Sequence, residues 1–476
     1  MESFNRMFHP RGVAVIGASA NPKKMGYHAL KSLMSCGFKG YVYPVNPRYK
    51  ELFGLKTYPS IKEVPDPVDL AVVVVPSTQA PLMVAECGKR GIAGAVLITA
   101  GFKEAGLEEG LKLHEELAGE ARRSNVKIIG PNTFGFVNLH ANLNASFTPS
   151  FSALRRGPIS LVSQSGGVCH VLMPYALEQG IGFSKIVGLG NRVNVDFPDM
   201  LDYLASDPDT RSVALYVEGV DNPRELMAAA KRTVKVKPVV AYKTGRSRAA
   251  DEASWSHTGS LAGNYRLYEA AFKQAGVLTV SDSVELVSAA KALAFQPPAR
   301  GRRVAVISLV AGLGIIAADT CEGQGLILTR FTRETEEALR KLLPPYTIRT
   351  NPVDLGFVAN DPDTCGNAVE IVASDRNVDA ISLNYIYSWS EGFMELPVKW
   401  IINAFKAYGK PLVMCLRYPK NIWDAEKQQL EDNGIPTFPT PELAAKSLAR
   451  LCEYGEVLRK LGVNKDEGAS AFKGSS

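Results

Sequence analysis

Short, continuous apolar runs recur along the chain and constrain its fold more than any other feature. Helix-length segments such as Tyr27–Cys36 and Thr78–Arg90 separate these runs. A run that is apolar throughout is typical of a strand in a parallel sheet that is covered on both faces. The alternation therefore predicts a doubly wound α/β sheet, whose ligands bind at the carboxyl ends of the strands. The runs in the first 150 residues are Val13–Ile16, Tyr41–Val45, Leu70–Val75, Ala95–Thr99 and Lys127–Ile129.

The same alternation returns twice, after linker-like stretches at residues 146–158 and Phe295–Arg303. The second set of expected strands is Ile159–Val162, Lys185–Gly188, Val213–Val217, Val239–Tyr242 and Val277–Val280, and the third is Val304–Ser308, Ala380–Asn384 and Pro411–Leu416. A chain of 476 residues has the length of roughly three domains of ~150 residues. We expect three consecutive doubly wound parallel-sheet domains at 1–150, 151–297 and 300–462, and a disordered tail at 463–476.

Charge and cysteine usage narrow the class of protein. The net charge of +6 suits anionic small ligands, and the cations do not form the basic stripe of a nucleic-acid binder. The seven cysteines include no Cys-x-x-Cys pair, which argues against a zinc site and against a disulfide framework. The first residues contain no signal core, and no apolar run reaches ~18 residues. We expect a soluble, cytoplasmic protein that binds no metal, nucleic acid or membrane.

Two loops of the first domain point to a nucleotide. Gly17–Lys24 follows the first strand and precedes a helix, so its backbone N–H groups could hold a pyrophosphate, although it is not Gly-x-Gly-x-x-Gly. An NAD-binding unit places an acid at the end of its second strand, where this chain has Asn46-Pro47-Arg48. A cation there favours coenzyme A or NADP. Arg48 could equally lie in a solvated turn.

One of the six histidines, His257, lies in the segment Ser254–Gly263 among small and hydroxylated residues. Imidazole titrates at about pH 6.5, so much of it is neutral and nucleophilic at pH 7. The glycines Gly259 and Gly263 let such a loop move and approach an anion closely. Taken alone, the pattern fits a phosphate-handling loop and a surface loop with an incidental histidine equally well.

Other features of the second domain favour the functional interpretation. Ser163–Gly167 and Gly188–Asn191 each follow a strand and are rich in donors for a phosphate-sized anion. Glu218 ends the expected strand Val213–Val217. A carboxylate there could bind one imidazole nitrogen and leave the other free to attack, although Glu218 could also be a helix cap or a solvated edge residue.

With these pieces in place, the chain resembles the α subunits of the nucleoside-diphosphate-forming acyl-CoA synthetases, the ADP-forming acetyl-CoA synthetase group related to succinyl-CoA synthetase. The resemblance covers nearly all of residues 6–462. The motifs that carry it are Gly17-Ala-Ser, Pro44-Val-Asn-Pro47, Ala100-Gly-Phe102, Gly130-Pro-Asn132, Ser163-Gln-Ser-Gly166, Leu189-Gly-Asn191, Leu215-Tyr-Val-Glu218, Ser256-His-Thr-Gly-Ser-Leu-Ala-Gly263 and Asn351-Pro-Val-Asp354.

The resemblance implies a Rossmann-like coenzyme A-binding domain followed by two flavodoxin-like ligase domains. His257 would be the transiently phosphorylated histidine, and Glu218 would be its partner. The phosphate would be bound by Ser163, Gln164, Ser165, Gly166, Gly190 and Asn191. Coenzyme A would be bound by Gly17, Ser19, Asn21, Lys23, Asn46, Arg48, Pro76, Ala100, Gly101, Phe102, Pro131 and Asn132.

The implied reaction is reversible. Phosphate attacks an acyl-CoA to give acyl phosphate and CoA, and His257 then carries the phosphoryl group to ADP. The three α/β domains leave no room for the family's ATP-grasp domain, so we expect a separate β subunit that holds ADP or ATP with Mg. Thr133 stands where many relatives have Cys, and Ser308–Gly314 has fewer Asn and Gly residues than its counterparts.

Two other classes of function compete with the ligase. A non-catalytic CoA-binding sensor or scaffold would need neither His257 nor Glu218. An NAD(P)-dependent oxidoreductase predicts an acid after the second strand, which is absent. The presence of His257 and Glu218 and the missing acid both favour the ligase subunit. Its substrate would be a small carboxylic acid or its acyl-CoA.

Overall fold

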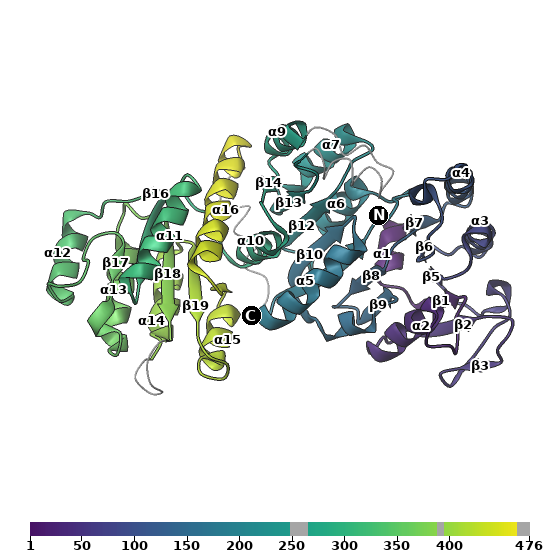
Figure 1. Ribbon diagram of the computed structural model, residues 1–476, viewed down its shortest axis with the longest axis horizontal. Helices are drawn as coiled ribbons and strands as arrows, with labels where there is room; N and C mark the ends of the chain where they lie inside the picture. Colours follow the sequence, from purple (N-terminus) through teal and green to yellow (C-terminus); the bar gives the residue numbers. More distant parts are fainter. Residues whose placement is uncertain (248–264, 388–394, 464–476) are drawn as a thin grey trace. The chain divides into compact units, whose positions relative to one another are not determined.

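The computed structural model describes residues 1–247, 265–387 and 395–463. Contacts divide the chain into two compact units, Met1–Ser283 and Val284–Ser476, each built of helices packed on parallel sheets (Figure 1). Among the described residues, no helix has both the length and the apolar character needed to cross a membrane. The predicted tail lies outside these residues, apart from Val463.

The first sheet is entirely parallel, with the strand order β2-β1-β5-β6-β7. Its strands are β1 Gly12–Ile16, β2 Tyr41–Val45, β5 Leu70–Val73, β6 Gly94–Leu97 and β7 Lys127–Ile129. The accompanying helices are α1 Glu2–Phe8, α2 Met25–Ser35, α3 Ala80–Lys89 and α4 Glu108–Arg123, with the 3-10 turns η1 Ile61–Glu63, η2 Ser77–Gln79 and η3 Lys103–Ala105 and the small hairpin β3 Glu51–Leu52 and β4 Leu55–Lys56. This is the doubly wound arrangement that the apolar runs predict.

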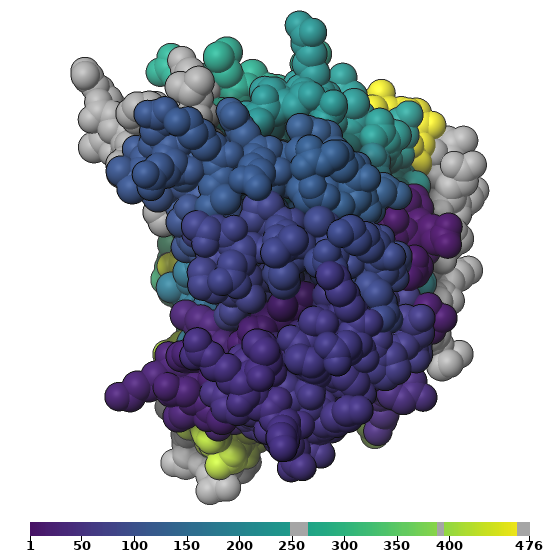
Figure 2. All heavy atoms as spheres, turned by 90° about the vertical axis from the view of Figure 1, so that its right-hand side faces the viewer, coloured from purple at the N-terminus to yellow at the C-terminus, as the bar shows by residue number. Residues whose placement is uncertain are grey.

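The second sheet has the order β14-β13-β12-β10-β11-β8-β9. Its strands are β8 Gly135–Asn138, β9 Leu143–Ser146, β10 Arg155–Ser163, β11 Gly182–Gly188, β12 Ser212–Val217, β13 Val239–Lys243 and β14 Leu278–Thr279. Its helices are α5 Gly166–Gln179, α6 Phe197–Ser206, α7 Pro223–Thr233 and α9 Tyr265–Ala275, with the turn η4 Pro149–Ala153. In Figure 2, purple-to-blue residues of the first sheet's layers fill most of the visible face, and teal residues of the second sheet's layers border them above.

The junction between these two sheets differs from the linker expected at residues 146–158. β8 pairs antiparallel with β11, and β9 pairs with β8, so residues before 150 complete the second sheet. β10 begins at Arg155, inside the expected linker. Because β8 and β9 are buried along their whole length, this hairpin is part of the core. The two sheets therefore belong to one compact unit.

The second unit contains a parallel sheet of order β16-β15-β18-β19-β20, with β17 beside β15. Helix α11 packs against α16, and α16 covers β18 and β19. The strands are β15 Arg303–Ser308, β16 Ile327–Leu328, β17 Val353–Asp354, β18 Ala380–Ile386, β19 Leu412–Arg417 and β20 Thr437–Phe438. The helices are α10 Ser283–Phe295, α11 Ala311–Gly323, α12 Arg333–Leu342, α13 Pro362–Ser374, α14 Val398–Tyr408, α15 Asp424–Asp432 and α16 Pro441–Lys460, with the turn η5 Gly356–Val358.

The division at Ser283 differs from the boundary expected at 297–300. Helix α10 belongs with the second unit, because Lys291 Nζ lies 2.6 Å from Glu431 Oε1 and donates to the carbonyl of Thr437 at 3.0 Å. The side chain of Gln296, just after α10, also accepts a hydrogen bond from Leu412 N at 2.8 Å. The three domain limits given by the sequence remain a prediction.

A buried carboxylate fixes the amino-terminal edge of the first sheet. Asp69 is 1% exposed and accepts hydrogen bonds from Arg11 Nε at 2.9 Å and from Arg6 Nη2 at 2.8 Å. These hydrogen bonds, above all those from Arg11, hold the pKa of the Asp69 carboxyl well below its usual range. Asp69 thereby joins helix α1 and the start of β1 to β5, away from the carboxyl ends where ligands bind.

Candidate active site

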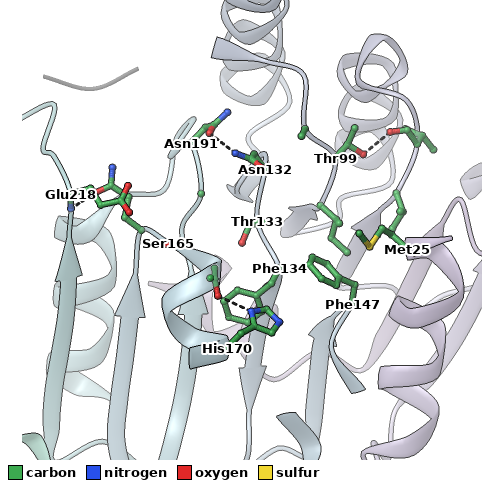
Figure 3. Close-up of a pocket in the computed structure, with 18 residues that line it drawn as sticks. Met25, Thr99, Asn132, Thr133, Phe134, Phe147, Ser165, His170, Asn191 and Glu218 are labelled. Carbon is green, nitrogen blue, oxygen red and sulfur yellow. Dashed lines mark hydrogen bonds between the residues drawn. The ribbon is translucent and has the colours of Figure 1, made fainter. Parts of the chain in front are cut away.

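Two cavities lie at the carboxyl ends of the strands in the first unit. The coenzyme cleft, as we call the larger one, has a volume of about 780 Å³ and is lined by loops after β1, β2 and β5. The reaction cavity, of about 610 Å³, is lined by loops after β5, β6, β7, β10, β11 and β12 (Figure 3). Met25, Val74 and Val75 line both. A ligand that fills the coenzyme cleft therefore has a direct way into the reaction cavity.

Two glycines let helix α2 start close to the first sheet. Gly17 has φ +90°, and a Cβ on it would lie 2.2 Å from the carbonyl oxygen of Val74. A Cβ on Gly26 would lie 2.1 Å from the carbonyl oxygen of Gly17. Within residues 1–247, 265–387 and 395–463, no side chain caps the amino terminus of α2, so its first N–H groups suit an anion in the coenzyme cleft.

Side chains of the coenzyme cleft give it a positive character. Lys24, Arg48 and Lys62 line it, and the one carboxylate among the described lining residues is that of Glu86, which forms an ion pair with Lys62 at 3.1 Å. Asn46 ties the loop after β2 to the loop after β1, because its Nδ2 donates to the carbonyl of Ala18 at 2.8 Å. A surplus of cations beside an apolar floor suits a phosphorylated ligand.

The polar end of the reaction cavity is the amino terminus of α5. Ser165, Gly166 and Gly167 line it, and no side chain of the described residues caps the helix with a hydrogen bond. Ser163 holds the preceding loop, because its hydroxyl donates to the carbonyl of Ser165 at 2.7 Å and accepts from Ser165 N at 3.2 Å. Uncapped N–H groups and the helix dipole favour a bound anion at this point.

Three loops meet beside this helix terminus. Asn132 Nδ2 donates to Asn191 Oδ1 at 3.5 Å (Figure 3), and Asn191 Nδ2 donates to Glu104 Oε2 at 2.5 Å. Gly190 has φ +56°, and a Cβ there would lie 2.3 Å from the carbonyl oxygen of Pro131. The ends of β7 and β11 therefore approach closely enough to present both asparagines to one cavity.

Glu218 lies at the end of β12, where it lines the cavity and is 7% exposed. Gln164 Oε1 accepts hydrogen bonds from Glu218 N at 2.9 Å and Gly219 N at 3.0 Å. The buried Lys243 donates to the carbonyl of Glu218 at 2.8 Å. The backbone that carries Glu218 is therefore held from two sides, by Gln164 and by Lys243. Burial, together with the nearby charge of Glu218, raises the pKa of Tyr216 to about 12, so this phenol stays neutral at pH 7.

The opposite end of the reaction cavity is apolar. Phe134 and Phe147 line it, together with the ring of His170 on α5 (Figure 3). His170 Nδ1 lies 2.7 Å from the carbonyl oxygen of Gly166, and its Nε2 lies 2.9 Å from Thr148 Oγ1. The cavity thus joins an anion-binding end to a hydrophobic end.

Most of the predicted site residues line these two cavities. The coenzyme cleft includes Gly17, Ser19, Asn46, Arg48 and Pro76. The reaction cavity includes Ala100, Asn132, Gln164, Ser165, Gly166, Gly190, Asn191 and Glu218. The structure brings these residues together, while their roles remain a prediction. His257 lies outside the described residues.

Six predicted residues, Asn21, Lys23, Gly101, Phe102, Pro131 and Ser163, line neither cavity. The side chain of Phe102 is fully buried, and its N–H and that of Gly101 donate to the Glu104 carboxylate. The N–H of Lys23 donates to Asn21 Oδ1 at 2.9 Å, which shapes the loop after β1. In this structure these residues build the loops and do not form the cavity walls.

Sequence reasoning gave no role in the site to Glu104, Thr133, His170 or Lys243. The Thr133 hydroxyl donates to the carbonyl of Gly188 at 2.5 Å and accepts from Gly135 N at 3.0 Å. His170 follows the Ser163–Gly167 loop by one helical turn, which is the one signal that could have indicated it.

Outside 248–264, 388–394 and 464–476, no three or more His, Cys, Asp or Glu residues are grouped so as to hold a metal ion. All seven cysteines lie in the described part, and none forms a disulfide.

Family models match three consecutive segments of the chain. A CoA binding domain matches residues 11–138, a succinyl-CoA ligase-like flavodoxin domain matches 156–293, and a Ligase-CoA domain matches 304–452. Together with the two cavities, they define a protein of the CoA-ligase class.

Similar proteins narrow this class. The chain is 40% identical over 452 residues to the α subunit of acetate–CoA ligase (ADP-forming) II of Pyrococcus furiosus, covering 94% of this chain and 97% of that one. It is 39% identical to acetate–CoA ligase (ADP-forming) of Methanocaldococcus jannaschii, covering 96% of this chain and 64% of that longer protein. It also superimposes, with a TM-score of 0.86 and 33% identity over 100% of both chains, on dinucleotide-forming acetyl-coenzyme A synthetase 1 of Candidatus Korarchaeum cryptofilum in complex with phosphate and ADP. The chain belongs to the ADP-forming acetate–CoA ligase family.

Proposed function

We propose that this chain is the α subunit of an ADP-forming acyl-CoA synthetase, which interconverts acyl-CoA, ADP and phosphate with carboxylic acid, CoA and ATP. The observation that carries the proposal is the junction of the two cavities at Met25, Val74 and Val75. This junction connects the cation-lined coenzyme cleft to the reaction cavity, where the amino terminus of α5 can bind an anion and Glu218 supplies a carboxylate. A CoA-binding sensor would need only the cleft.

Coenzyme A lies in the coenzyme cleft in this proposal. Its phosphates are placed at the uncapped start of α2 and beside the cations Lys24 and Arg48. Its thiol end passes Met25 and Val75 and enters the reaction cavity. Asn46 and Gly17 hold the loops that form the cleft and act through the backbone.

Inorganic phosphate is held at the N–H groups of Ser165–Gly167 and by the amide of Asn191. One phosphate oxygen attacks the thioester carbon, and the C–S bond breaks to release CoA and an acyl phosphate. His257 then attacks phosphorus, and the bond from phosphorus to the acyl oxygen breaks to release the carboxylate. Attack by the β-phosphate of ADP on phosphohistidine breaks the P–N bond and forms ATP. Glu218 orients the imidazole and stabilises its positive charge.

The nucleotide with Mg belongs to a separate ATP-grasp β subunit in this proposal, giving a hetero-oligomer. This chain covers 97% of the α-subunit relative of Pyrococcus furiosus but 64% of the Methanocaldococcus relative, which is a longer protein. The acid differs among similar chains, since one relative is named for 4-hydroxybutyrate. The names of the relatives therefore do not fix the acyl group.

The test is detection of acid-labile phosphate on this chain after incubation with phosphate and acyl-CoA, alone and with its co-purified partner. We expect label on the wild type and on the control His140→Ala, whose ring lies against the carbonyl of Gly157, and none on His257→Ala. CoA affinity should be equal in all three proteins. Absence of label from the wild type under every condition, with CoA still bound, would refute the relay and favour a CoA-binding sensor.

A further inference from the structure

A third cavity, of about 620 Å³, is lined only by residues of the second unit and has no part in the function proposed above. It lies at the amino-terminal edge of that unit's sheet, because its lining includes Arg303, Asp379 and Pro411, which begin or directly precede β15, β18 and β19. We call it the basic cavity. We propose that the basic cavity binds a nucleoside polyphosphate, at a site separate from the two cavities of the first unit.

The charge of the basic cavity favours an anion. Among the described residues that line it, five carry a cationic side chain and one, Asp379, carries a carboxylate. That carboxylate is already compensated, because Arg303 Nη2 donates to Asp379 Oδ1 at 2.9 Å and Arg303 Nε donates to Oδ2 at 3.0 Å. The other four cations therefore give the cavity a surplus of positive charge that suits phosphate groups. They are Arg300, Arg376, Lys410 and Arg459.

Lys410 is half-buried in the lining, so its ammonium group is partly removed from water. It donates to the carbonyl of Asp375 at 2.6 Å, and an ammonium group has two further N–H donors. Burial lowers the pKa of the Lys410 ammonium, against the opposing effect of Asp375 and Asp379. The nearby guanidinium groups of Arg300 and Arg303 lower this pKa further. A bound phosphate would offset the repulsion between these cations.

The same cations could serve only to neutralise helix carboxyl termini, because α13 and α14 end at this edge of the sheet. Lys410 and Arg459 fit that role, since each donates to a backbone carbonyl. Arg300 and Arg376 do not: within the described ranges, neither side chain makes a hydrogen bond or an ion pair. Both are exposed and line the cavity, and the guanidinium fork matches two phosphate oxygens.

The basic cavity also has apolar surface that suits a nucleobase. Pro297, Pro298, Pro411 and Leu458 line it, together with Tyr408, whose side chain is 37% exposed. A flat base can pack on these apolar groups and stack on the phenol ring. Inorganic phosphate would use the cations alone, and a nucleoside would use the apolar groups alone. A nucleoside polyphosphate uses both, and the volume is that of a small-molecule site.

The experiment is calorimetry of this chain with ADP, pyrophosphate and adenosine, in saturating CoA so that the coenzyme cleft is filled. We expect ADP to bind at one site about threefold more tightly than pyrophosphate, because of the ring contacts, and adenosine to give no binding heat. Arg300→Ala and Lys410→Met should each weaken ADP binding about tenfold. Tyr408→Ala should bring the affinity for ADP close to that for pyrophosphate.

Arg333→Ala is the matched control and should bind ADP as the wild type does. Arg333 lies on α12, outside the lining of the basic cavity, and its side chain is 87% exposed. Differential scanning fluorimetry without ADP checks that each variant is folded. With ADP, the Tm of the wild type and of Arg333→Ala should rise, because the ligand binds the folded protein, and that of Arg300→Ala should rise less.

Three outcomes would overturn the inference. The first is the absence of ADP binding to the CoA-saturated wild type, or ADP binding that both Arg300→Ala and Lys410→Met leave unchanged. The second is equal affinity for ADP and pyrophosphate in the wild type, which would leave a polyanion site without selectivity for a nucleotide. The third is ADP binding only by a variant that lacks residues 464–476, which follow Val463 of the lining and include Asp466 and Glu467. None of these results depends on phosphorylation of His257, so the ligase function is tested separately.

Discussion

The two hydrogen bonds that Gln164 accepts allow a quantitative test of how Glu218 is positioned. Gln164 is 5% exposed, and its Oε1 accepts from the buried N–H groups of Glu218 and Gly219 at 2.9 and 3.0 Å. Gln164→Met keeps the length of the side chain and removes this acceptor. A buried N–H without an acceptor costs ~1–3 kcal/mol. We use the lower value for each, about 2 kcal/mol in all, because the hydrogen bond from Lys243 to the Glu218 carbonyl remains.

If the variant raises the activation free energy of His257 phosphorylation by this amount, because Glu218 is no longer held in place, phosphorylation slows by about 30-fold, at ~1.4 kcal/mol per tenfold. The assay is the initial rate of acid-labile labelling with acyl-CoA and phosphate, beside calorimetry of CoA binding. The CoA affinity should stay within about twofold, because Gln164 lines the reaction cavity and not the coenzyme cleft.

Gln429→Met, at an exposed position of α15, is the matched control and should label at the wild-type rate. A folded Gln164→Met protein that labels at the wild-type rate would refute this reasoning, because the two hydrogen bonds would then not position Glu218. A parallel loss of CoA affinity would also refute it, since it would place the effect of Gln164 in CoA binding.

Three further predictions concern the scaffold. Asp69→Asn should destabilise the first unit by about 3 kcal/mol and lower its Tm in differential scanning fluorimetry by about 6–12 °C, whereas Glu108→Gln, in an exposed ion pair, should change it little. Because folding lowers the pKa of Asp69, its stabilisation is present above about pH 4 and fades as the pH falls further, so a pH-independent difference would contradict this origin. Gly17→Ala should weaken CoA binding at least tenfold in calorimetry, because its Cβ would lie 2.2 Å from a backbone carbonyl, and Gly37→Ala, which also has positive φ but open space around the Cβ, should not. Thr133→Val should lower the free energy of unfolding by about 2 kcal/mol in denaturant titration, and an unchanged midpoint would show that the hydroxyl bridge between β8 and β11 contributes nothing.

Local sequence patterns predicted the strands of the parallel sheets well. The expected strands Tyr41–Val45 and Lys127–Ile129 match β2 and β7 at both ends, because these strands coincide with short, mostly apolar runs. The hairpin β8–β9 was not predicted, since its place in the second sheet depends on pairing with β11, about 50 residues away. Pairing over that distance leaves no periodicity in the hairpin itself.

The site was predictable where it depends on strand ends and less so where it depends on side-chain packing. Glu218 and Ser165 follow strands directly, so parallel-sheet topology places them at one edge. Phe102 also follows a strand, but its ring turns into the core against His114. His170 lies within the mostly apolar helix α5, so its sequence context does not indicate a site residue. Only the fold brings it to the wall of the cavity.

The choice of donors in the reaction cavity agrees with a reaction that must run in both directions. Phosphate at the start of α5 would be held by backbone N–H groups and by Asn191, without a lysine or arginine among the described lining residues. A fixed cation there would stabilise bound phosphate and acyl phosphate strongly and would oppose transfer of the phosphoryl group away. Neutral donors bind the anion less tightly, so the phosphoryl group can pass between acyl oxygen and imidazole without a deep minimum on either side. Glu218, the one carboxylate among the described residues that line the cavity, would then favour the positively charged imidazole ring after transfer and balance the donors at the helix terminus.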